Sequence, residues 1–131
     1  MKVLDASAFL CFLQNESGAD TVAVALKDEC LMSAVNFAEV LRKLTGLNQH
    51  PDDAYKFLFD NFIVGGVIKV MPFSHLDAKV ATELYPATKR YGLSLADRSC
   101  LSLAKQNKCQ ALTTDKVWSK LNVGIDIKVI R

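Results

Sequence analysis

Apolar residues along the chain follow two patterns, short continuous runs and longer stretches in which they recur every three or four positions. The short runs are typical of buried strands, and the longer spacing is typical of amphipathic helices. The runs predict strands at residues 2–5, 31–33, 67–71, 111–114 and 127–130. The periodic stretches predict helices at residues 6–13, 19–27, 34–44, 51–63, 74–84, 94–106 and 115–121. Because strands and helices alternate, we expect an α/β fold with a mostly parallel central sheet and helices on both faces.

Two of the predicted helices carry recognisable start signals. Pro51 fits the first position of a helix, and Asp52 and Asp53 follow it in the first turn, where the helix dipole favours negative charge. Ser74 and Asp77 have the spacing of a capping box.

The helix predicted at residues 51–63 has one apolar face. We expect this face to pack inward through Tyr55, Leu58, Phe59, Phe62 and Ile63. Phe57 falls on the opposite side of the same helix. It is therefore exposed, packed against other core residues, or a candidate contact for a partner protein.

The chain has 131 residues, and we expect residues 1–131 to form one domain. No apolar run approaches the ~20 residues that span a bilayer, and the start of the chain lacks the apolar segment of a signal peptide. We therefore expect a soluble, cytoplasmic protein with no membrane contact. Four scattered cysteines without a Cys-x-x-Cys pair argue against a zinc or redox site, and we expect them to be small buried residues.

The net charge of +2 hides an asymmetry between the halves of the chain. Residues 1–65 hold five Lys/Arg against nine Asp/Glu, whereas residues 66–131 hold eleven against five. A basic second half suits a polyanionic partner, although solvated helix faces explain it equally well.

Four acidic residues stand at positions of possible chemical interest. Asp5 and Asp115 follow predicted strands, Asp97 lies three residues after Ser94 near a helix start, and Glu39 borders an apolar helix face. Each of the three aspartates could simply cap a helix, because caps of this type are common.

Glu39 also has an ordinary explanation. It could form surface ion pairs with Arg42 or Lys43, which lie three and four residues further along the same predicted helix.

The four acids together support a more specific prediction than any one of them does alone. In open α/β sheets, ligands bind beyond the carboxyl ends of the strands, where loops from different strands meet. Carboxylates that share such a site repel one another unless a cation neutralises them. Oxygen ligands without His or Cys favour Mg²⁺ or Mn²⁺, which also binds substrate phosphates. The pattern therefore predicts a metal site that suits phosphodiester hydrolysis.

Other phosphate chemistries fit the sequence less well. It lacks the glycine-rich loops that bind nucleotides and dinucleotides, so we expect no nucleotide cofactor. A phosphatase with an aspartyl nucleophile would place a second acid two residues after Asp5, where Ser7 stands. A receiver-like domain would need paired acids after the first strand, and these are absent as well.

The acids and their neighbours resemble the PIN-domain ribonucleases, and within them the VapC-type toxins of bacterial and archaeal toxin–antitoxin pairs. Four motifs in order along nearly the whole chain carry this resemblance: Val3-Leu-Asp-Ala-Ser7, Ser33-Ala-Val-Asn-Phe-Ala-Glu-Val40, Gly92-Leu-Ser-Leu-Ala-Asp97 and Leu112-Thr-Thr-Asp-Lys-Val-Trp118. The resemblance implies a PIN-like three-layer α/β sandwich, in agreement with the hydrophobic pattern.

The resemblance also implies a function and a set of site residues. It implies a Mg²⁺- or Mn²⁺-dependent endoribonuclease whose acidic site is formed by Asp5, Glu39, Asp97 and Asp115. In this interpretation the Thr113 and Thr114 hydroxyls orient a ligand or water. Arg98 and Lys116 each follow a site acid and could contact phosphate, or could lie on a solvated surface.

The expected partners are an RNA substrate, a cognate antitoxin protein and a second copy of the chain in a homodimer. Two alternatives stay open at this point. A PIN nuclease of RNA processing would share every acid but lack an antitoxin, and a non-catalytic PIN-like binding module would keep the fold without binding metal.

Overall fold

Five parallel strands form the centre of the molecule. The computed structural model describes residues 1–47 and 50–131. Its strands are β1 (Lys2–Leu4), β2 (Cys30–Ser33), β3 (Ile68–Met71), β4 (Gln110–Thr113) and β5 (Ile127–Val129), and they pair in the order β3-β2-β1-β4-β5. Each of these pairings is parallel. The predicted α/β fold is confirmed, and the mostly parallel sheet is parallel throughout the described strands.

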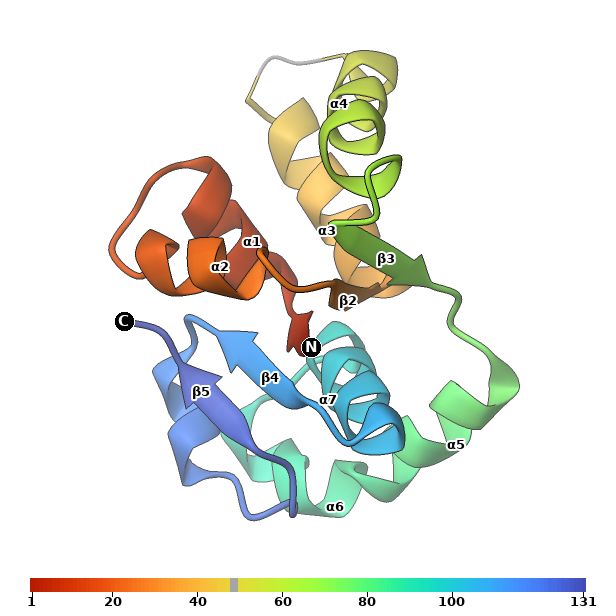
Figure 1. The fold of residues 1–131 in the computed structure, drawn as a ribbon. Coiled ribbons are helices and arrows are strands. Elements are labelled where there is room, and N and C mark those ends of the chain that lie inside the picture. Colours follow the sequence, from red (N-terminus) through yellow and green to blue (C-terminus); the bar gives the residue numbers. More distant parts are fainter. Residues whose placement is uncertain (48–49) are drawn as a thin grey trace.

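Helices cover both faces of this sheet, as the sequence predicts (Figure 1). On one face lie α1 (Ala6–Leu13), α2 (Ala19–Ala25), α3 (Ala34–Thr45) and α4 (Pro51–Leu58), and on the other lie α5 (His75–Glu83), α6 (Tyr85–Thr88) and α7 (Leu95–Asn107). Neighbouring strand residues point to opposite faces of the sheet. Leu4 therefore packs into the hydrophobic core on the side of α1 to α4, and Val3 packs into the core on the side of α7.

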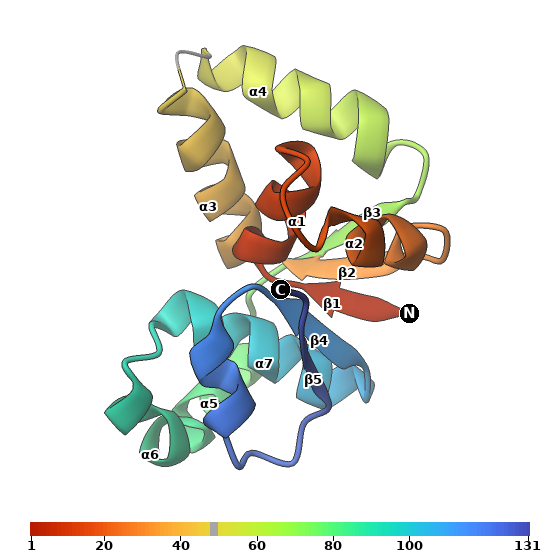
Figure 2. The same ribbon diagram turned by 90° about the vertical axis from the view of Figure 1, so that its left-hand side faces the viewer.

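The carboxyl ends of the strands gather several polar segments. Because all five strands are parallel, β1 and β4 end at the same edge of the sheet, and α1 and the 3-10 helix η3 (Lys116–Lys120) follow there. Helices α3 and α7 contact each other and begin at this edge (Figure 2). The residues just after β1 and β4 are therefore close in space to the first turns of two other helices.

Two segments that the sequence predicts as helices are wholly or partly a type of helix other than the α-helix. The helix predicted at residues 51–63 is α4 followed by a π-helix, η1 (Phe59–Ile63), in which the Val64 N–H donates to the Phe59 carbonyl at 2.9 Å. The short helix predicted at residues 115–121 is the 3-10 helix η3. Hydrophobic spacing alone does not distinguish these windings from an α-helix.

The π-helix changes which aromatic side chains of this segment are buried. Phe62 packs edge-on against Phe9, with ring centroids 5.0 Å apart. Tyr55 and Phe59 stack on each other near the surface, where they are 48% and 39% exposed. The prediction that both face the core is therefore wrong. Tyr55 lies beside the buried face of α4, which runs through Ala54 and Leu58, and Phe59 begins the wider winding that follows.

The helix start predicted at Ser74 is confirmed. Ser74 and Asp77 form the predicted capping box at the start of α5, and Gly92 ends the 3-10 helix η2 (Lys89–Tyr91) with a φ of 73°. Three cysteines are buried and Cys109 is half-buried. Among the described residues, no helix combines the length and apolar character needed to cross a membrane.

Candidate active site

Asp5 is the buried acid of the candidate site. It follows β1, caps α1, and is only 5% exposed. Its Oδ1 accepts hydrogen bonds from the Ser7 hydroxyl at 2.7 Å and the Ala8 N–H at 2.8 Å, and its Oδ2 accepts one from the Thr113 hydroxyl at 2.5 Å. These donors come from α1 and from the end of β4, so they join two neighbouring segments around one carboxyl group.

The environment of Asp5 disfavours its ionised form. Burial raises its pKa from 3.8 to about 6, and the negative charge of Asp97 adds to the rise. The hydrogen bonds from Thr113, Ala8 and Ser7 oppose it. Asp5 therefore has an unneutralised charge at neutral pH that a nearby cation would stabilise.

Asp97 lies in the first turn of α7 and belongs to a complete capping box. Its Oδ2 accepts from the Ser94 N–H at 2.9 Å, and its own N–H donates to the Ser94 hydroxyl at 3.2 Å. No described residue donates a hydrogen bond to Oδ1 of Asp97. The cap therefore fixes one oxygen of this carboxylate and leaves the other available.

Glu39 is held by a buried amide. The Nδ2 group of Asn36, which is 1% exposed, donates to Glu39 Oε1 and to the carbonyl of Ala96, each at 3.2 Å. Asn36 thus connects α3 to the residue just before Asp97 on α7. Among the described residues, no ion pair joins Glu39 to Arg42 or Lys43. The surface ion pair considered for Glu39 is therefore not formed.

Three of the four predicted acids face one cavity, which we call the acidic pocket. It has a volume of about 260 Å³ and is lined by Asp5, Ala6, Ser7, Leu10, Glu39, Arg42, Lys43 and Asp97. The same three acids act on the buried Cys100 thiol behind the pocket. Burial raises the pKa of Cys100 well above its ordinary value, and the charges of Asp5, Asp97 and Glu39 raise it further.

Asp115 occupies a different place from the other three acids. It is exposed, does not line the acidic pocket, and caps η3 by accepting from the Val117 N–H at 3.1 Å. Its own N–H donates to Thr113 Oγ1 at 3.1 Å, and the Thr113 hydroxyl in turn donates to Asp5. Asp115 is thus connected to the buried acid through one hydroxyl group.

The two threonines of the fourth motif differ in their contacts. Thr113 is fully buried and binds Asp5 directly, whereas Thr114 takes part through its backbone, whose N–H donates to the Ser7 hydroxyl at 3.0 Å. Ser7 therefore joins both strand ends, a contact that the sequence motifs did not single out. A serine two residues after a capping aspartate is the available sequence signal, since its hydroxyl reaches local backbone and carboxyl groups.

The two candidate phosphate contacts lie outside the acidic pocket. The Arg98 guanidinium donates to the Ala81 carbonyl at 3.2 Å and lies over the Tyr85 ring, with its Cζ 5.1 Å from the centroid. Lys116 is exposed on η3. Contacts of either residue with phosphate stay a prediction, whereas Arg42 and Lys43 are the cations that line the pocket itself.

Asn36 is the site residue that sequence reasoning missed most clearly. Asn36 is buried in the face of α3 that packs inward, whereas Ala38 on the same helix is exposed. A polar residue one helical turn before a candidate acid is the signal that could have identified it, because positions i and i+3 lie on one face.

Comparison with known proteins gives a family match and several similar folds. Residues 2–123 match the sequence model of the PIN domain. No curated protein matches the chain in sequence. Three similar solved structures share 14% to 19% sequence identity with this chain. At this level of identity, the similarity shows the fold alone.

Three of these structures cover nearly the whole chain. VapC20 of Mycobacterium tuberculosis, described as a sarcin-ricin loop cleaving toxin, has a TM-score of 0.71 at 14% identity, with 100% of this chain and 99% of that chain covered. FitAcB from Neisseria gonorrhoeae has a TM-score of 0.70 at 19% identity, with 97% and 96% covered. DNA-bound VapBC from Salmonella typhimurium has a TM-score of 0.70 at 14% identity, with 98% of each chain covered.

The raised pKa of Asp5 predicts a pH-dependent stability. In metal-free buffer, the free energy of unfolding of the wild type should fall relative to Asp5→Asn as the pH rises from 3.8 to about 6. In this window the folded protein keeps a proton that the unfolded chain releases, so the stability present below pH 3.8 is lost. A shift of this size corresponds to about 3 kcal/mol. Urea unfolding at several pH values measures the difference.

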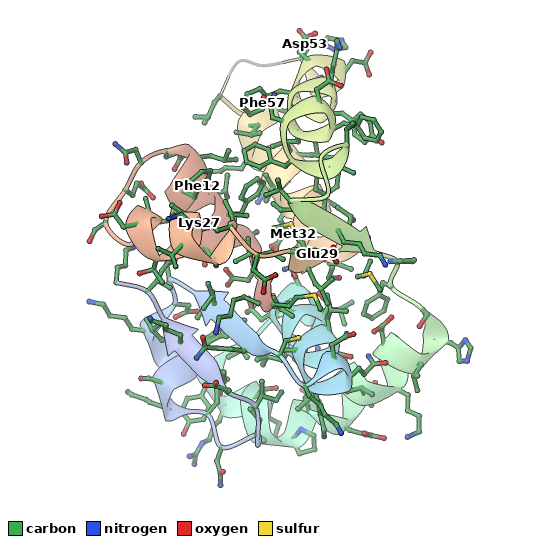
Figure 3. The ribbon with its side chains drawn as sticks, in the orientation of Figure 1. Phe12, Lys27, Glu29, Met32, Asp53 and Phe57 are labelled. Carbon is green, nitrogen blue, oxygen red and sulfur yellow. The ribbon has the colours of Figure 1, made fainter. Side chains whose placement is uncertain are left out.

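The control for this experiment is Glu29→Gln, which removes an exposed acid beside β2 (Figure 3). Its difference from the wild type should not change across the same pH window. Parallel pH profiles for the wild type and Asp5→Asn would contradict the assigned shift.

The buried amide of Asn36 predicts a measurable loss of stability on truncation. Asn36→Ala should lower the free energy of unfolding by about 1–3 kcal/mol, because Glu39 and the Ala96 carbonyl each lose a buried donor. Asn61 is exposed and donates to the Phe57 carbonyl at 2.8 Å. Asn61→Ala is therefore the matched control, with an expected change within about 0.5 kcal/mol. Equal losses in the two variants would refute the assigned role of Asn36.

Proposed function

The chain belongs to the PIN domain family, and from this membership we propose that it is a Mg²⁺- or Mn²⁺-dependent endoribonuclease that serves as the toxin of a toxin–antitoxin pair. Proteins of this family are generally nucleases. The observation that carries the proposal is the acidic pocket, in which Asp5, Glu39 and Asp97 from three separate segments face one cavity. Ordinary helix caps would not need to converge in this way.

The donor set of the acidic pocket fits a hard divalent cation. Its acids offer oxygen ligands, which Mg²⁺ and Mn²⁺ prefer. Oδ1 of Asp97 and Oε2 of Glu39 accept no hydrogen bond from any described residue. Burial of Asp5 leaves a charge that a cation would stabilise. Within residues 1–47 and 50–131, no three acidic, His or Cys side chains are already close enough to enclose an ion.

We assign the metal-binding role to Asp5, Glu39 and Asp97, with Asp115 as a further candidate ligand. When bound, the ion would supply Lewis-acid stabilisation of phosphate and a more acidic water molecule. Thr113 and Ser7 hold the Asp5 carboxylate in one orientation, and Asn36 does the same for Glu39.

The basic side chains of the acidic pocket have a separate role in this proposal. Arg42 and Lys43 follow Glu39 on α3 and line the pocket without pairing with Glu39. Both are therefore available to bind phosphate oxygens of an RNA strand. Arg98 and Lys116 remain further candidates for such contacts.

The proposed partners follow from the same family. VapC20 is described as a toxin that cleaves the sarcin-ricin loop, and VapBC from Salmonella typhimurium was solved bound to DNA. For this chain we propose an antitoxin partner and a homodimer. Phe57, which is 47% exposed on α4, stays a candidate for a protein contact (Figure 3).

Metal binding and RNA cleavage provide the first test. The wild type should bind Mn²⁺ in calorimetry and cleave RNA, and EDTA should stop cleavage. Asp97→Asn should lower the cleavage rate by at least about 100-fold and weaken Mn²⁺ binding, because it removes a ligand charge. An Asn at this position can still accept from the Ser94 N–H, so α7 keeps its cap.

Glu29→Gln, which removes an exposed acid outside the acidic pocket, is the charge-matched control and should leave both properties unchanged. Unaltered Mn²⁺ binding and cleavage in Asp97→Asn would disprove the ligand assignment. A wild type that binds no divalent ion would instead favour a non-catalytic binding module.

The toxin role has its own test in living cells. Induced expression of the wild type in a bacterial host should arrest growth, whereas expression of Asp97→Asn should not, because arrest depends on RNA cleavage. Co-expression of a short protein encoded next to the gene should restore growth and co-purify with the chain. RNA cleavage in vitro without any growth arrest would favour a nuclease of RNA processing.

A further inference from the structure

A second cavity lies on the sheet face that α5, α6 and α7 cover, and we call it the basic pocket. It has a volume of about 280 Å³ and is lined by Pro86, Ala87, Arg90, Tyr91, Lys120 and Asn122. Two of these residues are cations and none is a carboxylate. The charged side chains of the basic pocket are therefore positive, whereas the acids of the acidic pocket are negative.

The two cations of the basic pocket are not neutralised by the described part of the chain. Arg90 and Lys120 are exposed, and neither forms an ion pair with a described residue. By contrast, Lys56 and Lys79 each pair with an acid one helical turn away. Unpaired cations at the mouth of a cavity attract anions such as phosphate.

The aromatic ring of Tyr91 lies next to one of these cations. The Arg90 guanidinium lies over the half-buried ring of Tyr91, with its Cζ 4.7 Å from the centroid, and its Nη2 donates to the Tyr91 hydroxyl. The contact places the guanidinium against the ring, and the plane of a guanidinium can stack on a nucleobase. The amide of Asn122 can donate to and accept from the edge of such a base.

The basic pocket is joined by short segments to two of the site acids. Helix η3 begins directly after Asp115, so Lys120 lies roughly 10 Å further along at the ~2.0 Å rise of a 3-10 helix. Helix η2 carries Arg90 and ends at Gly92, from which the chain enters α7 and reaches Asp97. Both segments lie at the edge of the sheet where β1 and β4 end (Figure 2).

We propose that the basic pocket binds a phosphate and the adjoining base of a single-stranded RNA whose cleaved bond lies in the acidic pocket. This inference rests on the proposed ribonuclease function. Clustered carboxylates repel an RNA strand, so cations beyond Arg42 and Lys43 of the acidic pocket would add to the affinity. The flat guanidinium and the amide would then position one base relative to the cleaved bond.

The test is RNA binding by a double variant, Arg90→Ala with Lys120→Ala. Fluorescence anisotropy with a labelled single-stranded RNA oligonucleotide in EDTA buffer separates binding from metal-dependent cleavage. The Kd should rise roughly tenfold at low salt, because two cations are lost. The slope of log K against log salt should become smaller by about 0.7 to about 1.4, the change expected for one or two lost phosphate contacts.

Two control variants sharpen the result. Lys27→Ala with Lys56→Ala removes the same charge from the opposite face of the sheet, where Figure 3 shows Lys27 beside α2, and should leave the salt slope unchanged. Arg90→Lys keeps the charge but loses the flat stacking surface. It should keep the salt slope while weakening binding, which separates stacking from charge.

The outcomes separate this inference from the proposed function. If the double variant binds RNA as the wild type does, and the wild type cleaves RNA, the basic pocket is refuted and the ribonuclease function stands. If the wild type never cleaves RNA but the double variant binds it more weakly, the function fails and the pocket is supported. A wild type that does not bind RNA overturns both.

Discussion

The burial of the Asp5 carboxyl group is the constraint on which the rest of the site depends. A carboxylate removed from water is costly unless other groups bind it. Here the Ser7 and Thr113 hydroxyls and the Ala8 N–H do so, and they belong to α1 and to the end of β4. The same contacts therefore hold neighbouring segments in register at the edge of the sheet. Even so, the pKa of Asp5 remains raised, because burial outweighs these hydrogen bonds.

Helix capping and site formation use the same residues. Asp5 caps α1, Asp97 completes the cap of α7, and Asp115 caps η3. A cap fixes one carboxylate oxygen and leaves the second available, as at Asp97. Caps and ligands are therefore compatible explanations for the same side chain.

The hydrophobic pattern predicted the elements, and the acids' places in it predicted that Asp5 and Asp97 lie together, whereas the contacts that hold these acids were not predicted. The strands and helices follow from runs and periodicity, and the convergence of Asp5 and Asp97 follows from their places at strand and helix ends. The π-helix after Leu58 could not be predicted, because its spacing mimics an α-helix. Asn36 was missed because a single polar residue among apolar neighbours gives no periodic signal. Its burial nevertheless places its amide where it donates a hydrogen bond to Glu39.

The uneven charge of the two halves of the chain has a structural explanation in this fold. Asp5 and Glu39 come from the acidic first half, whereas Arg90 and Lys120 come from the basic second half. The proposed binding of a divalent cation and a polyanion requires acids and cations that do not pair with one another, and Arg42 and Lys43 line the acidic pocket without pairing with Glu39. The parallel sheet brings the acids together at one edge, and η2 and η3 hold the unpaired cations Arg90 and Lys120 in a separate pocket. Asp5 and Glu39 thus line one pocket and Arg90 and Lys120 another, with Asp97 in the first turn of α7 and Asp115 as the cap of η3.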